Sequence, residues 1–207
     1  MTAQAFWDRQ APKYAKKPIA DLTAYQEKLR YVKAVLRPTD HILEIGCGSG
    51  GTARQIASVV AHVTATDLSA EMIRIAKLRS EGYATGKPVF LQAAAAQDIA
   101  GQPFDAVCAF SLLHLVDDIP DVLNAVFRQV KPGSYFVSKT VCLKDGPRWM
   151  QWIVRLLMAV RIAPKVIIIS RTELTGHLIR AGFEIDQTKY FGKNRISPFI
   201  VARRSID

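Results

Sequence analysis

The sequence predicts an α/β fold in which seven strands form a mostly parallel sheet with helices on both faces. From His41 onward, short apolar runs rich in β-branched residues alternate with segments of helical character. The last two apolar runs, at 183–191 and 198–204, are joined by only a short connection. Because such a short link joins antiparallel neighbours, we expect one reversed strand at the carboxyl-terminal edge of the sheet.

The individual elements follow from apolar periodicity and from residues that start or stop helices. Strands are expected at 41–45, 62–67, 89–94, 104–110, 134–140, 183–191 and 198–204. Helices are expected at about 51–60, 69–82, 117–131, 147–163 and 171–181. Ser69 is a candidate N-cap, the Lys-Pro-Gly run at 131–133 should stop a helix, and Gly182 follows another.

Composition argues against several classes of protein. The three cysteines, Cys47, Cys108 and Cys142, are odd in number and far apart, so neither a disulfide framework nor a zinc site is expected. The N-terminus lacks the apolar segment of a secretory signal, and the most apolar stretch, 149–169, is interrupted by two arginines, a lysine and a proline. We therefore expect no metal, no membrane span and a cytoplasmic location.

The formal net charge is +10. Such a charge fits a polyanionic partner, either a nucleic acid or an anionic lipid surface. It fits a merely solvated basic face equally well.

The run HILEIGCGSGGTA, from His41 to Ala53, ends a strand and begins a helix with closely spaced glycines. These glycines can be counted in two registers. Gly46, Gly48 and Gly51 match a dinucleotide-binding turn, whereas Gly46, Gly48 and Gly50 match a turn that binds S-adenosylmethionine.

Two carboxylates flank the glycine run. Asp67, 19 positions beyond Gly48, can accept hydrogen bonds from both ribose hydroxyls of either cofactor. Glu44 would be unfavourable beside a pyrophosphate, whereas it favours the ammonium and sulfonium groups of S-adenosylmethionine. The run therefore favours the sulfonium cofactor.

Three segments carry a resemblance to a known family: LEIGCGSG (43–50), ATDLSAEMI (65–73) and FDAVCAFSLLHLV (104–116). Together they resemble the class I S-adenosylmethionine-dependent methyltransferases, and within these the branch that includes the quinone-biosynthesis enzymes. The resemblance covers about residues 38–140. It implies a Rossmann-like three-layer αβα sandwich with an antiparallel last strand, and S-adenosylhomocysteine as the product of the cofactor.

On this view residues 1–207 form a single methyltransferase domain in four parts. Residues 1–37 should be a helical cap over one end of the sheet, and 38–140 the cofactor-binding core. Residues 141–170 should contain a variable lid helix, and 171–207 the C-terminal helix with the antiparallel strand pair.

By position, the resemblance also implies cofactor contacts. They are Tyr14, Glu44, Gly46, Cys47, Gly48, Gly50, Asp67, Leu68, Met72, Gln97, Asp98 and Ser111. Leu68 and Met72 should pack on the adenine, Ser111 should meet the methionine end, and Tyr14 should either close over the cofactor or only pack within the cap. Where the family usually has an acid near the adenine amino group this chain reads AAQD, so Gln97, Asp98 or a backbone carbonyl should replace that acid.

Methyl transfer is an in-line displacement that mainly requires alignment and the exclusion of water. His114 is the candidate general base if the acceptor arrives protonated; otherwise it shapes the pocket. Acceptor choice should lie in 1–37 and 142–170. Residues 148–163 form a basic amphipathic helix with two tryptophans, which either packs on the sheet or acts as a lid that meets a hydrophobic acceptor or an anionic membrane.

Several functions therefore stand open. The first is methyl transfer to a small, hydrophobic acceptor such as a quinone precursor, a lipid or another metabolite. The second is an RNA methyltransferase, although FSLLH (110–114) replaces the NPPY-type motif of amino-methylating nucleic-acid enzymes. The third is a non-catalytic S-adenosylmethionine-binding protein, and a nicotinamide dehydrogenase is a more distant fourth.

Overall fold

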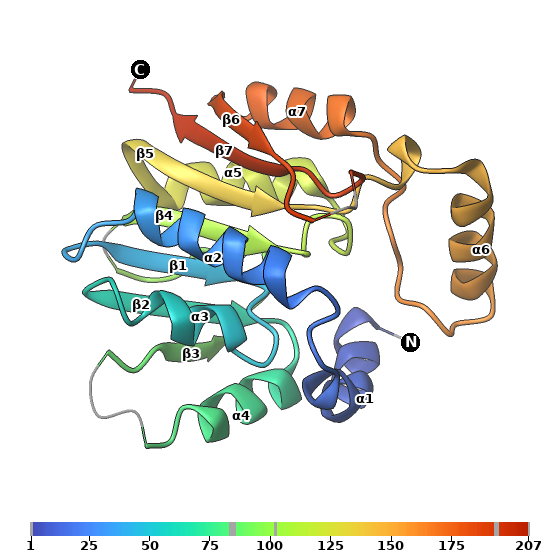
Figure 1. The fold of residues 1–207 in the computed structure, drawn as a ribbon, viewed down its shortest axis with the longest axis horizontal. Helices are drawn as coiled ribbons and strands as arrows, with labels where there is room; N and C mark the ends of the chain where they lie inside the picture. Colours follow the sequence, from blue (N-terminus) through green and yellow to red (C-terminus); the bar gives the residue numbers. More distant parts are fainter. Residues whose placement is uncertain (1, 83–85, 102, 193–194, 207) are drawn as a thin grey trace.

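A seven-stranded sheet runs through the centre of the computed structural model, which describes residues 2–82, 86–101, 103–192 and 195–206 (Figure 1). The strands lie in the order β3-β2-β1-β4-β5-β7-β6. Their bounds are β1 His41–Ile45, β2 His62–Asp67, β3 Val89–Gln92, β4 Phe104–Phe110, β5 Val130–Lys139, β6 Phe183–Lys189 and β7 Phe199–Arg204. Strand β7 pairs antiparallel with both β5 and β6, so the other six strands share one direction.

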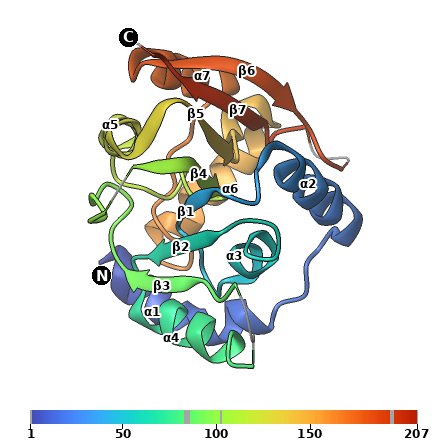
Figure 2. The same ribbon diagram turned by 90° about the vertical axis from the view of Figure 1, so that its left-hand side faces the viewer.

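Helices cover both faces of this sheet (Figure 2). One face carries α2, Leu22–Val35, and α3, Gly51–Ile56, and the other carries α5, Ile119–Gln129, and α7, Arg171–Arg180. Helix α4, Ala70–Arg79, lies beside β3 and packs against α1, Ala3–Lys16. Helix α6, Arg148–Ala159, follows the short 3-10 turn η1, Leu143–Asp145, and projects beyond the carboxyl ends of the parallel strands.

Alternation along the central strands divides the core between the two faces. In β1, Leu43 and Ile45 belong to the core cluster under α5 and α7, whereas Ile42 belongs to the cluster under α2 and α3. Glu44 follows the register of Ile42 and is buried on the α2–α3 side, with only 2% of its surface exposed. The period of two thus places a carboxylate inside the molecule at the end of a central strand.

The predicted fold class and the seven strands are confirmed, with two corrections. The reversed strand is not at the edge of the sheet, because β7 lies between β5 and β6. Lys131-Pro132-Gly133 does not stop a helix: α5 already ends at Gln129, and the run forms an irregularity inside β5, where the register with β4 shifts. A proline without an N–H and a glycine with φ of 72° suit such an interruption of the ladder.

The two helices of the N-terminal segment pack at different positions in the fold. Helix α1 lies at the carboxyl ends of the strands, where Asp8 Oδ1 accepts hydrogen bonds from Ser69 Oγ at 2.6 Å and from the Glu71 N–H at 3.2 Å. Helix α2 instead packs on a sheet face through Leu29 and Val32. Only the first of the two helices is therefore placed like a cap.

Candidate functional site

A cavity of about 330 Å³ opens at the carboxyl ends of β1, β2, β3 and β4. The strand order turns at β1 and β4, where the chain proceeds outward in opposite directions. In open α/β sheets ligands bind at such a switch point. Helix α1 closes the outer side of the cavity with Ala3, Trp7 and Tyr14.

The glycine loop between β1 and α3 forms one wall and decides between the two registers. Gly46, Gly48 and Gly50 have φ of 66°, 54° and 74°, whereas Gly51 is the first residue of α3 and is not among the glycines with positive φ. A Cβ on Gly50 would lie 2.8 Å from the Phe90 ring. The backbone thus requires glycine in the register of the sulfonium cofactor.

Asp67 faces the cavity from the end of β2. Its Oδ2 accepts a hydrogen bond from the Gly48 N–H at 2.8 Å, and its Oδ1 accepts one from the Ser69 N–H at 2.9 Å. Burial raises the pKa of this carboxyl, while the two backbone donors lower it. The same bonds tie the carboxylate to the glycine loop and to the start of α4, so its position is fixed for a ligand.

Glu44 lies behind the loop and is not among the cavity-lining residues. Its Oε2 is buried and has no hydrogen-bond partner among the residues that the structure describes. Burial raises the pKa of Glu44 to about 8, although the positive charge of Lys28 acts in the opposite direction. Ionisation of Glu44 would therefore be favoured by an additional positive charge close to it.

Lys28 is a residue that the sequence reasoning missed. Its Nζ lies 4.0 Å from the centroid of the Phe110 ring and 4.8 Å from that of Tyr25, and its side chain is buried. Burial lowers its pKa to about 8, while Glu44 raises it. Lys28 and the buried Ala24 and Val32 recur every four residues of α2, so helical periodicity was the signal that could have found it.

The opposite wall of the cavity is formed by Leu68, Met72 and the run Ala93–Ala96. The structure places Gln97 and Asp98 outside this lining. Asp98 is instead exposed and bound by Arg128, with a shortest contact of 3.0 Å. Of the three replacements expected for the usual acid, Gln97 and Asp98 thus lie outside the lining, Asp98 being paired with Arg128, and the backbone of the alanine run lies in it.

Of the residues expected to contact the cofactor, Ser111 and Tyr14 line the cavity, whereas Cys47 and Gly50 do not. Ser111 has a φ of 58°, an uncommon conformation for a residue other than glycine, and such conformations concentrate at functional sites. Cys47 is buried and donates its backbone N–H to Thr66 O at 2.8 Å. Its part is structural in this geometry.

His114 does not line the cavity. Its side chain is buried, its Nδ1 has no hydrogen-bond partner in the described part of the chain, and burial lowers its pKa to about 4. The ring is therefore neutral at physiological pH and weakly basic. Its role as general base stays a prediction.

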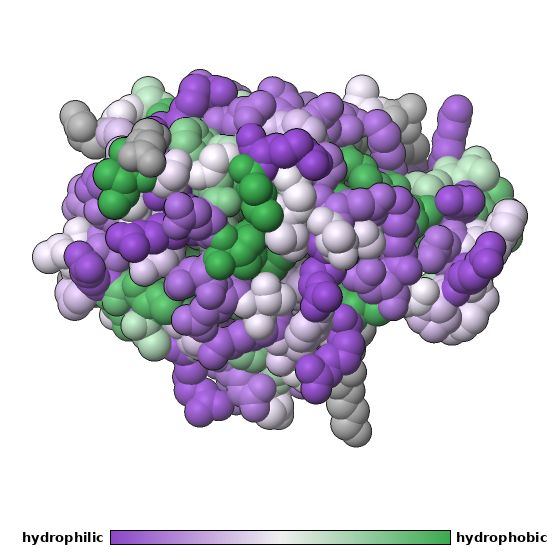
Figure 3. Space-filling model, turned by 90° about the horizontal axis from the view of Figure 1, so that it is seen from above, coloured by the Kyte–Doolittle hydropathy of each residue, from purple (hydrophilic) through white to green (hydrophobic). Residues whose placement is uncertain are grey.

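Helix α6 does not pack on the sheet, because none of its residues is buried. Seen from above, it projects from one end of the molecule with hydrophobic and hydrophilic side chains mixed on its surface (Figure 3). Trp149, Trp152, Ile153, Leu156 and Val160 are all exposed, with Trp152 at 67%. Their spacing places this apolar face outward.

The chain is similar in sequence to known methyltransferases. A family model described as a methyltransferase domain matches residues 7–188. The ubiquinone biosynthesis O-methyltransferase of Xylella fastidiosa (strain 9a5c) is 30% identical over 164 residues, 77% of this chain and 63% of that protein. Its namesake from Xanthomonas axonopodis pv. citri is 32% identical over 143 residues, 67% of this chain and 57% of that protein. The chain thus spans less than two thirds of the length of these curated relatives.

Solved structures share the fold. A SAM-dependent methyltransferase from Methanosarcina mazei aligns with a TM-score of 0.71 at 23% identity, over 86% of this chain and 98% of that one. Magnesium protoporphyrin IX methyltransferase from Synechocystis PCC 6803, solved with bound SAH, aligns with a TM-score of 0.73 at 18% identity, over 98% and 96%. Since the family model matches most of the chain, and the glycine register and fold agree with it, the protein belongs to the S-adenosylmethionine-dependent methyltransferases.

Proposed function

We propose that this protein transfers a methyl group from S-adenosylmethionine to a small, hydrophobic acceptor. The observation that carries the proposal is the division of the cavity into two zones. One zone contains the glycine loop, Asp67 and Leu68, and the other is an apolar wall. The wall consists of Trp7, Phe110, Leu112, Leu115, Val116 and Val122.

The first zone fits the cofactor by charge. The methionine end carries an ammonium and a carboxylate. Glu44 and Lys28 do not line the cavity, but they are buried groups of opposite charge type, and a bound ammonium would favour the ionised form of Glu44. Asp67 would accept hydrogen bonds from the ribose hydroxyls, and Leu68 and Met72 would pack on the adenine. When bound, the cofactor supplies a methyl group on a sulfonium, whose bond to sulfur breaks as the bond to the acceptor forms.

The O-methyltransferase names of the relatives support a hydroxyl group as the methyl acceptor. Among the described lining residues there is no histidine or lysine. Besides Asp67 and Tyr14, the ionisable side chains among them are the carboxylates of Asp117, Asp118 and Asp121. An acceptor that loses its proton readily, such as a phenol, would suit this site best, because it needs no strong base.

The exposed face of α6 supports a second part of the proposal, contact with an anionic membrane surface. Tryptophans on an apolar face flanked by arginines are typical of helices that lie in a lipid interface. Arg148 and Arg155 supply this charge, and the Arg155 guanidinium lies 5.8 Å from the centroid of the Trp152 ring. Across the described ranges no helix has the length and apolar content needed to cross a bilayer.

Methyl-labelled cofactor tests this function. The protein is incubated with it and a cell extract, and the lipid, small-molecule and RNA fractions are then separated. The label should enter the lipid-extractable fraction, and the Asp67→Ala variant should transfer little of it. Label in RNA alone would favour the nucleic-acid alternative, and no transfer into any fraction would contradict the enzymatic proposal.

A further inference from the structure

A second cavity lies beside the first, between α1 and the segment that follows α6. It is an open groove of about 540 Å³. The nine residues that line it are Phe6, Trp7, Gln10, Lys13, Tyr14, Lys16, Lys17, Ile162 and Pro164. Trp7 and Tyr14 line both cavities, so the groove and the proposed cofactor cavity share a wall.

The charged side chains that line this groove are all positive. Lys13, Lys16 and Lys17 are exposed, and none of them forms an ion pair with any residue in the described ranges. No acidic side chain is among the lining residues. Lysines three and four positions apart on a helix repel each other, and the half charge at the end of α1 offsets only part of three positive charges. An anion in the groove would relieve this repulsion.

The other wall of the groove is apolar and fixed in place. The chain leaves α6 through Arg161, which has a φ of 58°, and the N–H groups of Ile162 and Ala163 both donate to Leu157 O, at 2.9 and 3.1 Å. Lys165 then binds Asp117 at 2.9 Å. Ile162 lines the groove together with Phe6 and Trp7 of α1, while 65% of its surface stays exposed.

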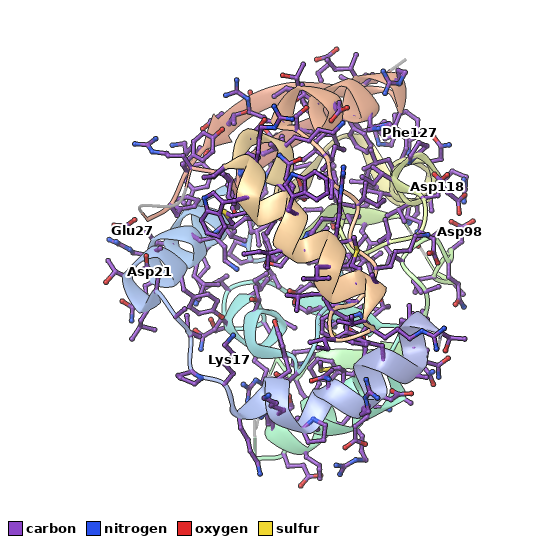
Figure 4. All side chains as sticks on the ribbon, turned by 90° about the vertical axis from the view of Figure 1, so that its right-hand side faces the viewer. Lys17, Asp21, Glu27, Asp98, Asp118 and Phe127 are labelled. Atoms are coloured by element: carbon purple, nitrogen blue, oxygen red, sulfur yellow. The ribbon has the colours of Figure 1, made fainter. Side chains whose placement is uncertain are left out.

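Two views agree on this arrangement. The C-terminal end of α6 approaches α1 both in Figure 1 and in Figure 4, where Lys17 is labelled at the point where α1 ends. Trp7 and Tyr14, whose ring centroids lie 6.1 Å apart, line both the groove and the cofactor cavity.

We propose that this groove is the subsite for the body of the methyl acceptor, and that the acceptor is an amphipathic molecule with an anionic group. The anionic group would lie against Lys13, Lys16 and Lys17, and the apolar body would lie along Phe6, Ile162 and Pro164. The reacting end would then pass Trp7 and Tyr14 into the first cavity. This inference rests on the proposed function and narrows its acceptor class.

Titration calorimetry with simple amphiphiles below their micellar concentrations tests the charge preference. Decanoate should bind the wild-type protein, and its affinity should fall as salt is added. Decyltrimethylammonium, which has the same chain and the opposite charge, should bind at least about tenfold more weakly. Equal affinities for the two amphiphiles would overturn the proposal.

Two sets of variants locate the site. K13Q/K16Q/K17Q should bind decanoate at least about tenfold more weakly, whereas R30Q/K77Q/K87Q removes the same charge from exposed positions outside the groove and should not. Ile162→Glu should weaken decanoate binding, and Ile162→Gln, equally polar but neutral, should weaken it much less. Equal effects of the two triple variants would place the anion elsewhere and overturn the proposal.

Cofactor binding separates this inference from the proposed function. The K13Q/K16Q/K17Q variant should bind S-adenosylmethionine like the wild type, because the three lysines do not line the first cavity. Decanoate binding in the groove without methyl transfer to any fraction would contradict the proposed function alone. Methyl transfer that the triple variant performs with unchanged KM for its acceptor would contradict the groove alone.

Discussion

The glycine loop after β1 and helix α6 lie at the same end of the sheet and differ in how their residues are held. The ionisable side chains of Glu44 and Lys28 are buried nearby, and positive φ angles favour glycine at three positions of the loop. Helix α6 has no buried residue and turns its apolar face to solvent. In the loop, the backbone conformation itself requires particular residues. On α6 the fold places no such requirement, so only a binding partner would constrain its exposed residues. Substitutions near the loop should therefore alter cofactor affinity or the stability of the fold. Substitutions on α6 should alter only the binding of the protein to a membrane surface.

The largest effect is expected for Asp67→Ala. Loss of two charge-assisted hydrogen bonds to the ribose, at about 1.5 kcal/mol each, should weaken S-adenosylmethionine binding by about 100-fold. Titration calorimetry measures this, and Asp98→Asn is the matched control, because Asp98 is exposed and lies outside the cavity lining. If Asp98→Asn lost a comparable amount of S-adenosylmethionine affinity, Asp98 would have to be counted among the cofactor-binding residues.

The next effect concerns stability at the buried His114, in the segment that follows β4. The pKa of His114 is about 4 in the folded protein, below the ordinary value of about 6.5 expected of the unfolded chain. As pH falls through this window only the unfolded chain takes up the proton, so stability is lost, by about 2 kcal/mol between pH 7.5 and pH 5. His114→Asn should lose that much less in urea unfolding at these two pH values. An identical loss in both proteins would assign the protonation to another group.

A smaller effect is expected for Glu44→Gln. Because a bound ammonium favours the carboxylate, and the pKa of Glu44 is raised to about 8 without it, cofactor affinity should rise as pH increases toward 8. The variant should bind about tenfold more weakly above that pH and lose this rise. Glu71→Gln, whose exposed ion pair with Arg74 lies away from the cavity, is the control and should keep the rise. A rise that persists in Glu44→Gln would contradict the role of this carboxylate.

The smallest effect on stability is expected on α6. Replacing Trp149 and Trp152 by serine should change the free energy of unfolding by less than about 0.5 kcal/mol, because both are exposed. Sedimentation with phosphatidylglycerol vesicles should nevertheless fall several-fold. Leu22 and Ile179, also exposed and replaced by serine, should leave vesicle binding unchanged. If the tryptophan pair and the Leu22/Ile179 pair changed vesicle binding equally, the proposed membrane contact of α6 would be contradicted.

The sequence predicted the central strands well, because β1, β2 and β4 are buried and their apolar runs end where the buried register ends. Asp67 was placed at the cavity for the same reason, since it ends one of these strands. Lys131-Pro132-Gly133 was misread because a proline and a glycine interrupt a strand as readily as they end a helix. Only the pairing of β5 with β4 distinguishes the two.

The site was predictable where the backbone dictated it and not where distant segments meet. Lys28 reaches the Phe110 ring from a helix far away in sequence, and Asp98 is bound by Arg128 from another element. Helical periodicity could have shown that Lys28 is buried, but local spacing does not show which distant residue either side chain contacts. The sequence also did not predict that α6 is exposed. An amphipathic pattern shows that one face of a helix is apolar, but it does not show what that face contacts.

The attachment of α1 to α4 bears on the order of events during turnover. Asp8 bonds to Ser69 and Glu71, and Arg79 bonds to Ala15 O and Ser49 Oγ. Helix α1 is thereby both the roof over one cavity and a wall of the groove next to it. A displacement of α1 that frees the spent cofactor would also dismantle the neighbouring groove. On the proposed function, the methylated acceptor would therefore leave the groove no later than the demethylated cofactor leaves the cavity.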